Sequence, residues 1–302
     1  MAGRPLLRHG LVATVLLVTG LSGCGLAGLV PPNGDSTRLH QQAQAALTRW
    51  ADAVAVAGGP SAFVPVGDLT AQVGDWEEPV GDNNKQALMA GLVEAAVSLP
   101  TERPPDGQLR WPDGSTDTVR LNSAQDALAG LKADATGSGC PTCVPLQITA
   151  ARLTSGSVET SRGPVQAPVW EFTLKGTLVR LTRVAIGASV TVAPPPWDPN
   201  DSPVGISIDS ASETPSGLEL MVEFVGAPGP GDQACGADYT AEAVESSLAV
   251  VVIVTEHPNI GLGGCSAVGA LRTAEVRLTA PLGARAVLEV KQGLPVAVSL
   301  TR

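Results

Sequence analysis

The sequence predicts an α+β fold, in which a small helix-rich N-terminal module precedes a mainly antiparallel β-sandwich or barrel-like domain. Two patterns predict it. Apolar residues recur at helical steps of three and four in the first part of the chain, whereas from Val144 onward short β-type runs alternate with turns. Aromatic residues make up only 3% of the chain, so Val, Leu, Ile and Ala have to build the core.

The chain begins with the three parts of a secretory signal sequence. Arg4 and Arg8 precede an apolar run, Leu11–Val18, and small residues follow it. The apolar run is too short to cross a hydrocarbon layer of about 30 Å comfortably as a helix. These features are typical of a secretory signal peptide.

The segment Leu21–Cys24 resembles the lipobox of bacterial lipoproteins. The resemblance implies that the sulfur of Cys24 receives a diacylglyceryl group and that residues 1–23 are a lipoprotein signal peptide that is removed. Cys24 then becomes the first residue, and a fatty acid such as palmitate also acylates the new amino terminus. Two acyl chains anchor a protein stably, whereas one gives marginal binding. The alternative, an uncleaved helix over residues 11–30, is disfavoured by its glycine-rich second half.

The charge balance excludes some partners. The first 23 residues contain two arginines and no acid, so 17 basic and 29 acidic residues remain and the net charge is −12. An acidic body does not bind nucleic acid, for which a basic surface supplies most of the affinity. The negative net charge also gives no electrostatic attraction to anionic lipid, so the covalent lipid is the expected membrane contact. Only 4 of the 19 basic residues are lysine, which together with the excess of Ala, Gly, Pro and Val indicates GC-rich coding and an actinobacterial source.

Cysteine usage fits export. Apart from Cys24 the chain has Cys140, Cys143, Cys235 and Cys265, an even number for an oxidising location. Four cysteines allow three pairings, of which we favour Cys140–Cys143 with Cys235–Cys265. The second pair would close a loop of about 30 residues, worth roughly 3–4 kcal/mol in the chain-entropy model.

Residues 24–35 are expected to form a tether, because their composition has no periodicity. The helix-rich module spans residues 36–136. Asp35 or Ser36 caps its first helix, which ends before Gly58. One face of this helix is apolar at Leu39, Ala43, Ala46, Leu47, Trp50 and Val54.

The rest of the module is predicted to contain two more helices and a hairpin. The second helix covers Asn83–Ser98. The hairpin strands Gln108–Trp111 and Thr118–Leu121 flank a Pro-Asp-Gly turn. Ser123 and Asp126 have the spacing of a capping box and open a third helix.

Residues 144–302 form the predicted β-rich domain. Leu248–Val254 is apolar on both faces and belongs in the centre of a sheet, whereas Thr273–Thr279 alternates and leaves one polar face for water. The predicted strands cover residues 146–153, 165–174, 178–186, 189–192, 205–208, 218–225, 239–244, 248–256, 273–279, 286–290 and 295–300.

Two of these segments, Val169–Leu174 and Pro281–Leu288, together with the Cys-x-x-Cys segment, resemble a group of secreted actinobacterial lipoproteins. That group is uncharacterised, so the resemblance implies no activity, cofactor or substrate.

The Cys140–Cys143 motif has a redox and a structural interpretation. A dithiol-exchange site places its first cysteine at a helix N-terminus, whereas a β-type run follows this motif, which favours a structural clasp. A zinc site would need two further ligands, and Cys235 and Cys265 do not supply a second Cys-x-x-Cys.

No catalytic set is evident. His40 and His257 are the only histidines after the signal, and there is no Gly-x-Ser-x-Gly elbow or His-Glu-x-x-His motif. The segment Asp198–Asp201 has oxygen ligands for a calcium ion, but a plain turn accounts for it better. The acidic group around Asp75 to Asp82 is expected to be a solvated face. We predict no catalytic residue, metal or cofactor. The candidate ligand-binding side chains are three tryptophans that could stack on a sugar or peptide, Trp76, Trp111 and Trp197.

The function expected from the sequence is a binding or scaffolding protein, anchored by lipid on the outer face of the cytoplasmic membrane, with an envelope protein or glycan as partner. One alternative is an envelope hydrolase that uses dispersed carboxylates. Another is a thiol oxidoreductase that uses Cys140 and Cys143.

Overall fold

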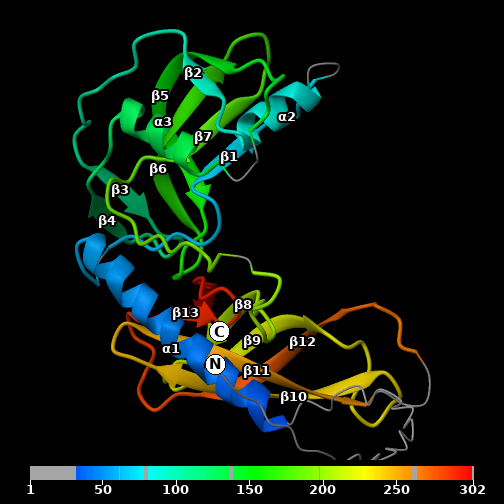
Figure 1. The fold of residues 1–302 in the computed structure, drawn as a ribbon. Coiled ribbons are helices and arrows are strands. Elements are labelled where there is room, and N and C mark those ends of the chain that lie inside the picture. Colours follow the sequence, from blue (N-terminus) through cyan, green and yellow to red (C-terminus); the bar gives the residue numbers. More distant parts are fainter. Residues whose placement is uncertain are drawn as a thin grey trace, which may run out of the picture.

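The computed structural model describes residues 32–60, 62–77, 81–135, 139–196, 198–259 and 264–300, without the side chains of residues 32–35 and 81. The described chain forms two bodies (Figure 1). The sandwich body consists of the N-terminal helix α1 (Pro32–Val56) and residues 205–300. The inserted body consists of residues 62–196, which lie between these two parts in the sequence.

The sandwich body contains two sheets that face each other. One has the order β10-β11-β13 and the other β12-β9-β8-β14. Their inward side chains form one core, to which Val222, Phe224, Val252 and Val276 contribute. The strands are β8 (Ser210–Glu213), β9 (Glu219–Gly226), β10 (Gly236–Glu245), β11 (Ala249–Asn259), β12 (Ala270–Arg277), β13 (Ala286–Glu289) and β14 (Ala297–Leu300).

Residues 249–254 of strand β11 are covered on both faces. Val250, Val252 and Val254 point into the core between the sheets, whereas Val251 and Ile253 pack against α1. This arrangement explains why the run from Leu248 to Val254 is continuously apolar, as expected for a strand that no solvent reaches.

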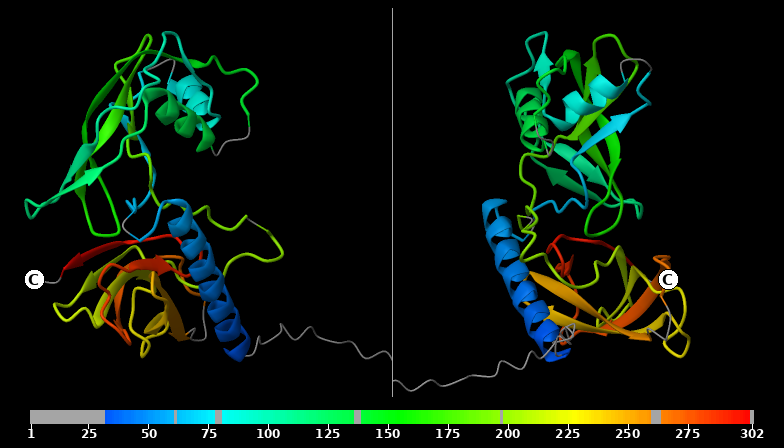
Figure 2. Two further views of the ribbon diagram at one scale, coloured as in Figure 1. Left: turned by 90° about the vertical axis from the view of Figure 1, so that its left-hand side faces the viewer. Right: turned by 45° about the vertical axis from the view of Figure 1, so that its right-hand side comes forward.

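Helix α1 lies along the outer face of the β10-β11-β13 sheet (Figure 2). Ala43 and Ala46 are fully buried, and Trp50 is 2% exposed. Gly293, in the loop between β13 and β14, has a φ of +74°, and a Cβ there would lie 2.8 Å from the Cβ of Ala46. A side chain at this position would therefore both strain the backbone and push the helix off the sheet.

The inserted body is built on a curved seven-stranded sheet. Strand β6 is its centre, because it pairs with β5 on one side and with β7 and, near Gln166, β3 on the other. The edges are β1, β2 and β4. The strands are β1 (Thr70–Val73), β2 (Val93–Ala95), β3 (Gly107–Arg110), β4 (Thr116–Val119), β5 (Leu146–Val158), β6 (Val165–Leu174) and β7 (Arg180–Val184).

Helices α2 (Gly81–Met89) and α3 (Ala124–Ala133) cover one face of this sheet. Phe172 and Leu181 of the sheet are fully buried under them. The Nε1 of Trp170 donates a hydrogen bond of 3.1 Å to the carbonyl of Asn122, just before α3. Arg183 of β7 pairs with Asp134 at the end of α3.

The two bodies meet at the C-terminal end of α1. The backbone N–H of Val298 in β14 donates to Ser161, in the turn between β5 and β6, and Val190 belongs to the same core as α1. The segment that returns from the inserted body is bound to α1, because Arg38 pairs with Asp201 and the side-chain amide of Gln42 exchanges hydrogen bonds with the backbone of Val204.

The predicted fold class, an α+β chain in which a helix-rich N-terminal part precedes a mainly antiparallel β-sandwich, is confirmed as a class. The hairpin at residues 107–119 and the capping box of α3, made by Ser123 and Asp126, are present. The boundary predicted between residues 36–136 and 144–302 lies inside the inserted body, because β2 pairs with β5 and β3 pairs with β6 across it. The first predicted helix packs on the last strands instead of on its sequence neighbours.

Three local predictions were wrong. Helix α1 begins at Pro32, before the expected caps, since proline is tolerated in a first helical turn. Helix α2 ends at Met89 instead of Ser98, because Gly91 takes a φ of +67° and closes the helix, with hydrogen bonds from Gly91 to Leu88 and from Leu92 to Ala87. No strand forms over residues 189–192 or 205–208, where the chain passes between the bodies.

None of the described helices is long and apolar enough to span a membrane.

If α1 completes the sandwich core, Trp50→Ala should lower the free energy of unfolding by about 3–5 kcal/mol, because it removes a large side chain that is 2% exposed. Thermal or denaturant unfolding measures this loss. Val56→Ala on the same helix is the control, since Val56 is 90% exposed and its loss should stay within about 0.5 kcal/mol. Equal and small effects of both substitutions would contradict the assignment of α1 to the core.

Candidate functional site

Both cysteine pairs that the sequence favoured are present. Cys140 and Cys143 are bonded with their Cα atoms 5.3 Å apart, and Cys235 and Cys265 with theirs 5.5 Å apart. The predicted lipidation site, Cys24, lies outside the described residues.

The Cys140–Cys143 loop is attached to α2. The side chain of Asn83 accepts a hydrogen bond from the N–H of Val144 and donates one to its carbonyl, and Gln86 contacts both sulfur atoms. The next regular element is strand β5, so Cys140 does not lie at a helix N-terminus. This geometry supports a structural clasp, which connects α2 to the beginning of β5.

The Cys235–Cys265 disulfide lies at one end of the sandwich body. It connects the first residues of β10 to the segment before β12. Cys235 has a φ of +64° and donates its N–H to Asn259 at the end of β11, at 2.7 Å. The disulfide therefore fixes the turn that leads into β10.

The predicted tryptophan platforms do not converge on one site. Trp76 is half-buried against the core under α2 and α3, and its indole N–H is buried without a hydrogen-bond partner among the described residues. Trp111 is half-buried in the hairpin of β3 and β4, where its Nε1 donates to Asp117 and the guanidinium of Arg162 lies over its ring at 4.3 Å. Trp197 lies outside the described residues.

The face of Trp111 that Arg162 covers is not open to a sugar or peptide ring. Arg162 is also 3.6 Å from Asp117, so the three side chains form one exposed contact between the hairpin and the turn after β5. Stacking of a ligand on this face would first have to displace the arginine.

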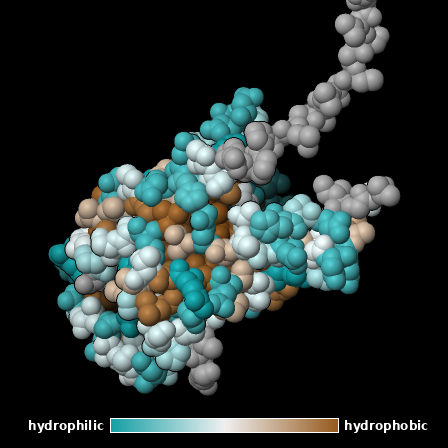
Figure 3. Space-filling view, turned by 90° about the horizontal axis from the view of Figure 1, so that it is seen from below, coloured by the Kyte–Doolittle hydropathy of each residue, from teal (hydrophilic) through white to brown (hydrophobic). Residues whose placement is uncertain are grey.

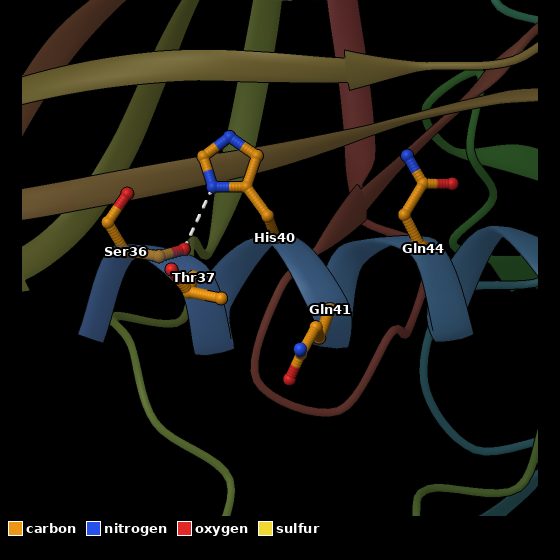
Figure 4. Close-up of a pocket in the computed structure, with 5 residues that line it drawn as sticks. All are labelled: Ser36, Thr37, His40, Gln41 and Gln44. Atoms are coloured by element: carbon orange, nitrogen blue, oxygen red, sulfur yellow. Dashed lines mark hydrogen bonds between the residues drawn. The ribbon is translucent and has the colours of Figure 1, made fainter. Parts of the chain in front are cut away.

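The hollow beside the first turns of α1 is lined by polar side chains of that helix alone (Figure 4). His40 bonds through Nδ1 to the carbonyl of Ser36 at 2.8 Å, and its Nε2 is 3.4 Å from Glu242 of β10. In Figure 4 Gln41 points away from His40 and Gln44, so the five labelled side chains do not surround a common point. The hollow is a shallow part of the helix surface.

A second, smaller hollow of about 120 Å³ lies where the two bodies meet. Trp50 and Val54 of α1, Val190, and Leu248 give it mostly apolar walls, and Arg285 is its charged side chain. Neither of these two hollows is lined by a carboxylate.

Arg285 is fully engaged by its own surroundings. Its side chain is 11% exposed, its Nη1 donates to Glu245 at 2.6 Å, and its Nη2 donates to the carbonyls of Ala280 and Pro281. Burial alone would raise the pKa of Glu245, but the hydrogen bonds from Thr279 and the charge of Arg285 outweigh it and lower that pKa. The arginine of the Pro281–Leu288 motif therefore holds a turn and has no free donor directed at a ligand.

Sequence analysis missed a polar cluster around Tyr239, the chain's single tyrosine. Its hydroxyl accepts from the N–H of Ala227 at 2.6 Å and donates to Glu256 at 2.9 Å, and Arg272 lies 5.5 Å from its ring. Burial is the main cause that raises the pKa of Tyr239. A Cβ on Gly226 would lie 2.4 Å from the hydroxyl, so this glycine is needed for the close approach. The scarcity of tyrosine was the only signal available in the sequence.

The remaining acidic and histidine candidates are bound to neighbours. Glu77 accepts from Thr177 and from the N–H of Leu178, which lowers its pKa. Asp201 of the possible calcium turn pairs with Arg38, and His257 bonds Thr240 at 2.9 Å. Within the described ranges no group of three or more His, Cys, Asp or Glu side chains is arranged to hold a metal ion.

Comparison with protein-family models, with curated proteins and with solved structures gave no match for this chain.

The Glu245–Arg285 pair generates a prediction about pH. Because the pKa of Glu245 is lowered on folding, its contribution to stability is present above the pKa of the unfolded state and is lost as the pH falls through that of the folded state. Glu245→Gln should therefore cost about 1.5–3 kcal/mol at pH 7, since it replaces an acceptor of charged donors. The difference in the free energy of unfolding between the variant and the parent should become smaller in acid. Denaturant unfolding at several pH values measures this difference.

Glu275→Gln is the matched control for this experiment. Glu275 is exposed and pairs only with Arg277, at 3.4 Å, so its loss should cost no more than about 1 kcal/mol. A loss of the same small size in both variants at pH 7 would show that the Glu245 pair does not hold the turn.

The two disulfides should differ in their effect on stability. Replacing Cys235 and Cys265 together by serine should cost about 3–4 kcal/mol, because the bond closes a loop with a sequence separation of 30. Replacing Cys140 and Cys143 together should cost only about 2 kcal/mol, because the separation is 3. Differential scanning calorimetry of the two double variants measures both losses. A larger loss of stability without the Cys140–Cys143 bond than without the Cys235–Cys265 bond would contradict this prediction.

Proposed function

We propose that this chain is a lipid-anchored binding or scaffolding protein on the outer face of the cytoplasmic membrane. The lipobox-like segment Leu21–Cys24 supports the anchor. The two disulfides, which persist in oxidising locations, support export.

The position of α1 is the observation that carries this proposal. Its first residue, Pro32, comes eight residues after Cys24, and the helix of 25 residues spans about 37 Å from there to the junction of the two bodies. An anchor at Cys24 therefore holds the sandwich body beside the membrane and the inserted body on its far side (Figure 1). Such an arrangement suits a protein that presents one body to other envelope components.

Of the functions expected from the sequence, thiol exchange is the one that the local geometry bears on. The Cys140–Cys143 loop precedes a strand instead of a helix, which supports a structural role for this disulfide. The partner is accordingly expected to be an envelope protein or glycan that contacts the surface of the inserted body.

The anchor is tested by mass spectrometry of the protein purified from cells that process lipoproteins. We expect a chain that begins at Cys24 and has a diacylglyceryl group on its sulfur. Cys24→Ala should keep the signal peptide and lack the lipid. A parent chain with residues 1–23 still attached, or with an unmodified sulfur at Cys24, would contradict this proposal.

The presenting role is tested by photo-crosslinking in intact cells. A crosslinker at Leu178, which is 81% exposed in the turn between β6 and β7, should capture a defined envelope component. The same crosslinker at Val56, which is 90% exposed at the end of α1, is the control. Failure to recover any envelope protein or glycan from the inserted body would contradict the presenting role.

A further inference from the structure

Three apolar side chains are exposed together at one end of the sandwich body. Val225, Val268 and Leu271 are 61%, 63% and 64% exposed. Val225 of β9 lies opposite Leu271 of β12 in the antiparallel register, on the outer face of their sheet. Gly269 lies so close that a Cβ there would be 2.5 Å from Val225. We call these three side chains the apolar end.

The Cys235–Cys265 disulfide holds the apolar end in place. It ties the segment that contains Val268 to the beginning of β10, and β10 is paired with the last residues of β11. The end of β9, the beginning of β10, the end of β11 and the beginning of β12 thus meet at the same end of the body.

Helix α1 begins at this same end. Trp50 and Val54, near the end of the helix, lie beside Leu248 at the beginning of β11. His40, near its beginning, faces Glu242, which pairs with Ile253 further along β11. The helix therefore runs antiparallel to β11, and its first turn points toward the end of the body at which β11 ends and β12 begins (Figure 1).

The chain before α1 is long enough to place both features at one surface. Pro32 comes eight residues after Cys24, and these eight Cα–Cα steps span up to about 28 Å when extended. The apolar end lies across the sandwich from α1, a distance on the order of 20 Å for layers spaced about 10 Å apart. A lipid on Cys24 can thus be in the bilayer while the apolar end touches it.

We propose that the apolar end, formed by Val225, Val268 and Leu271, inserts into the boundary between headgroups and acyl chains of the bilayer. This inference rests on the lipid anchor of the proposed function. The protein then contacts the membrane at two points, the lipid and the apolar end. These two contacts fix the orientation of the sandwich body, so that the inserted body points away from the membrane.

The surrounding charges identify the kind of lipid surface. Asp232, Asp238 and Glu256 are exposed near this end, and the nearby cation, Arg272, lies over the ring of Tyr239. Acidic side chains are repelled by anionic headgroups. The contact is therefore apolar, favours zwitterionic lipid and is insensitive to salt.

The hydrophobic residues visible from below do not by themselves define the contact. Figure 3 shows that they gather in the middle of the sandwich body, with hydrophilic residues around them. What distinguishes the apolar end is that its three side chains are large, each more than 60% exposed, and located where the tether begins.

The experiment uses the full lipidated chain in phosphatidylcholine vesicles. Leu271→Cys is labelled with the fluorophore nitrobenzoxadiazole, and quenching by doxyl-labelled lipid is measured. Val225→Cys is a second labelling position. Leu178→Cys, exposed at the far end of the inserted body, is the matched control. The native cysteines are in disulfides or lipidated, so each variant has one free thiol.

We expect quenching at positions 225 and 271 to be several-fold greater than at position 178, with no loss in high salt. Equal quenching at all three positions in vesicles that retain the lipidated protein would overturn this inference and leave the anchor standing. A chain without lipid by mass spectrometry would overturn both. Quenching that requires anionic phosphatidylglycerol and disappears in salt would overturn the apolar contact.

Discussion

The packing of α1 against β11 is the contact on which the rest of the architecture depends. Strand β11 is apolar on both faces, and the second sheet covers only one of them. Without the helix, Val251 and Ile253 would face water, and burial of each such side chain contributes roughly 1.5–3 kcal/mol. The helix has to come close for this, which is why Ala43 and Ala46 face the sheet and why Gly293 has no side chain beneath them.

Because of this contact, the inserted body is an insertion between two parts of the sandwich body. Because the first and last parts of the described chain share one core, the chain between them has to leave the sandwich and return to the same place. Arg38 and Gln42 of α1 bind the returning segment at Asp201 and Val204, so the helix contacts both the core and the connection. The direction of α1 then sets which body lies nearer to the predicted anchor.

Three charged side chains illustrate how this molecule holds turns and helix ends. Arg183 ties β7 to the end of α3, Arg285 binds a turn and Glu245, and Glu77 caps the turn between β6 and β7. Buried charges need such partners, because an unpaired charge in a low dielectric is costly. Arg285 of the Pro281–Leu288 segment is thus accounted for by the turn that it holds.

Features with a local cause could be predicted from the amino-acid sequence. These are the capping box at Ser123, the Pro-Asp-Gly hairpin, the buried character of the run Leu248–Val254 and the α+β class. Local patterns fix them because a cap, a turn or a periodicity involves residues a few positions apart. The end of α2 at Gly91 was equally local, and the apolar spacing beyond it misled the prediction. Other features depend on the three-dimensional structure. These are the partner of α1, the pairing of β2 with β5, and the surroundings of Trp76, Trp111 and Tyr239. Each depends on residues far apart in the chain, and an apolar stripe specifies that a surface will be buried without specifying which surface covers it.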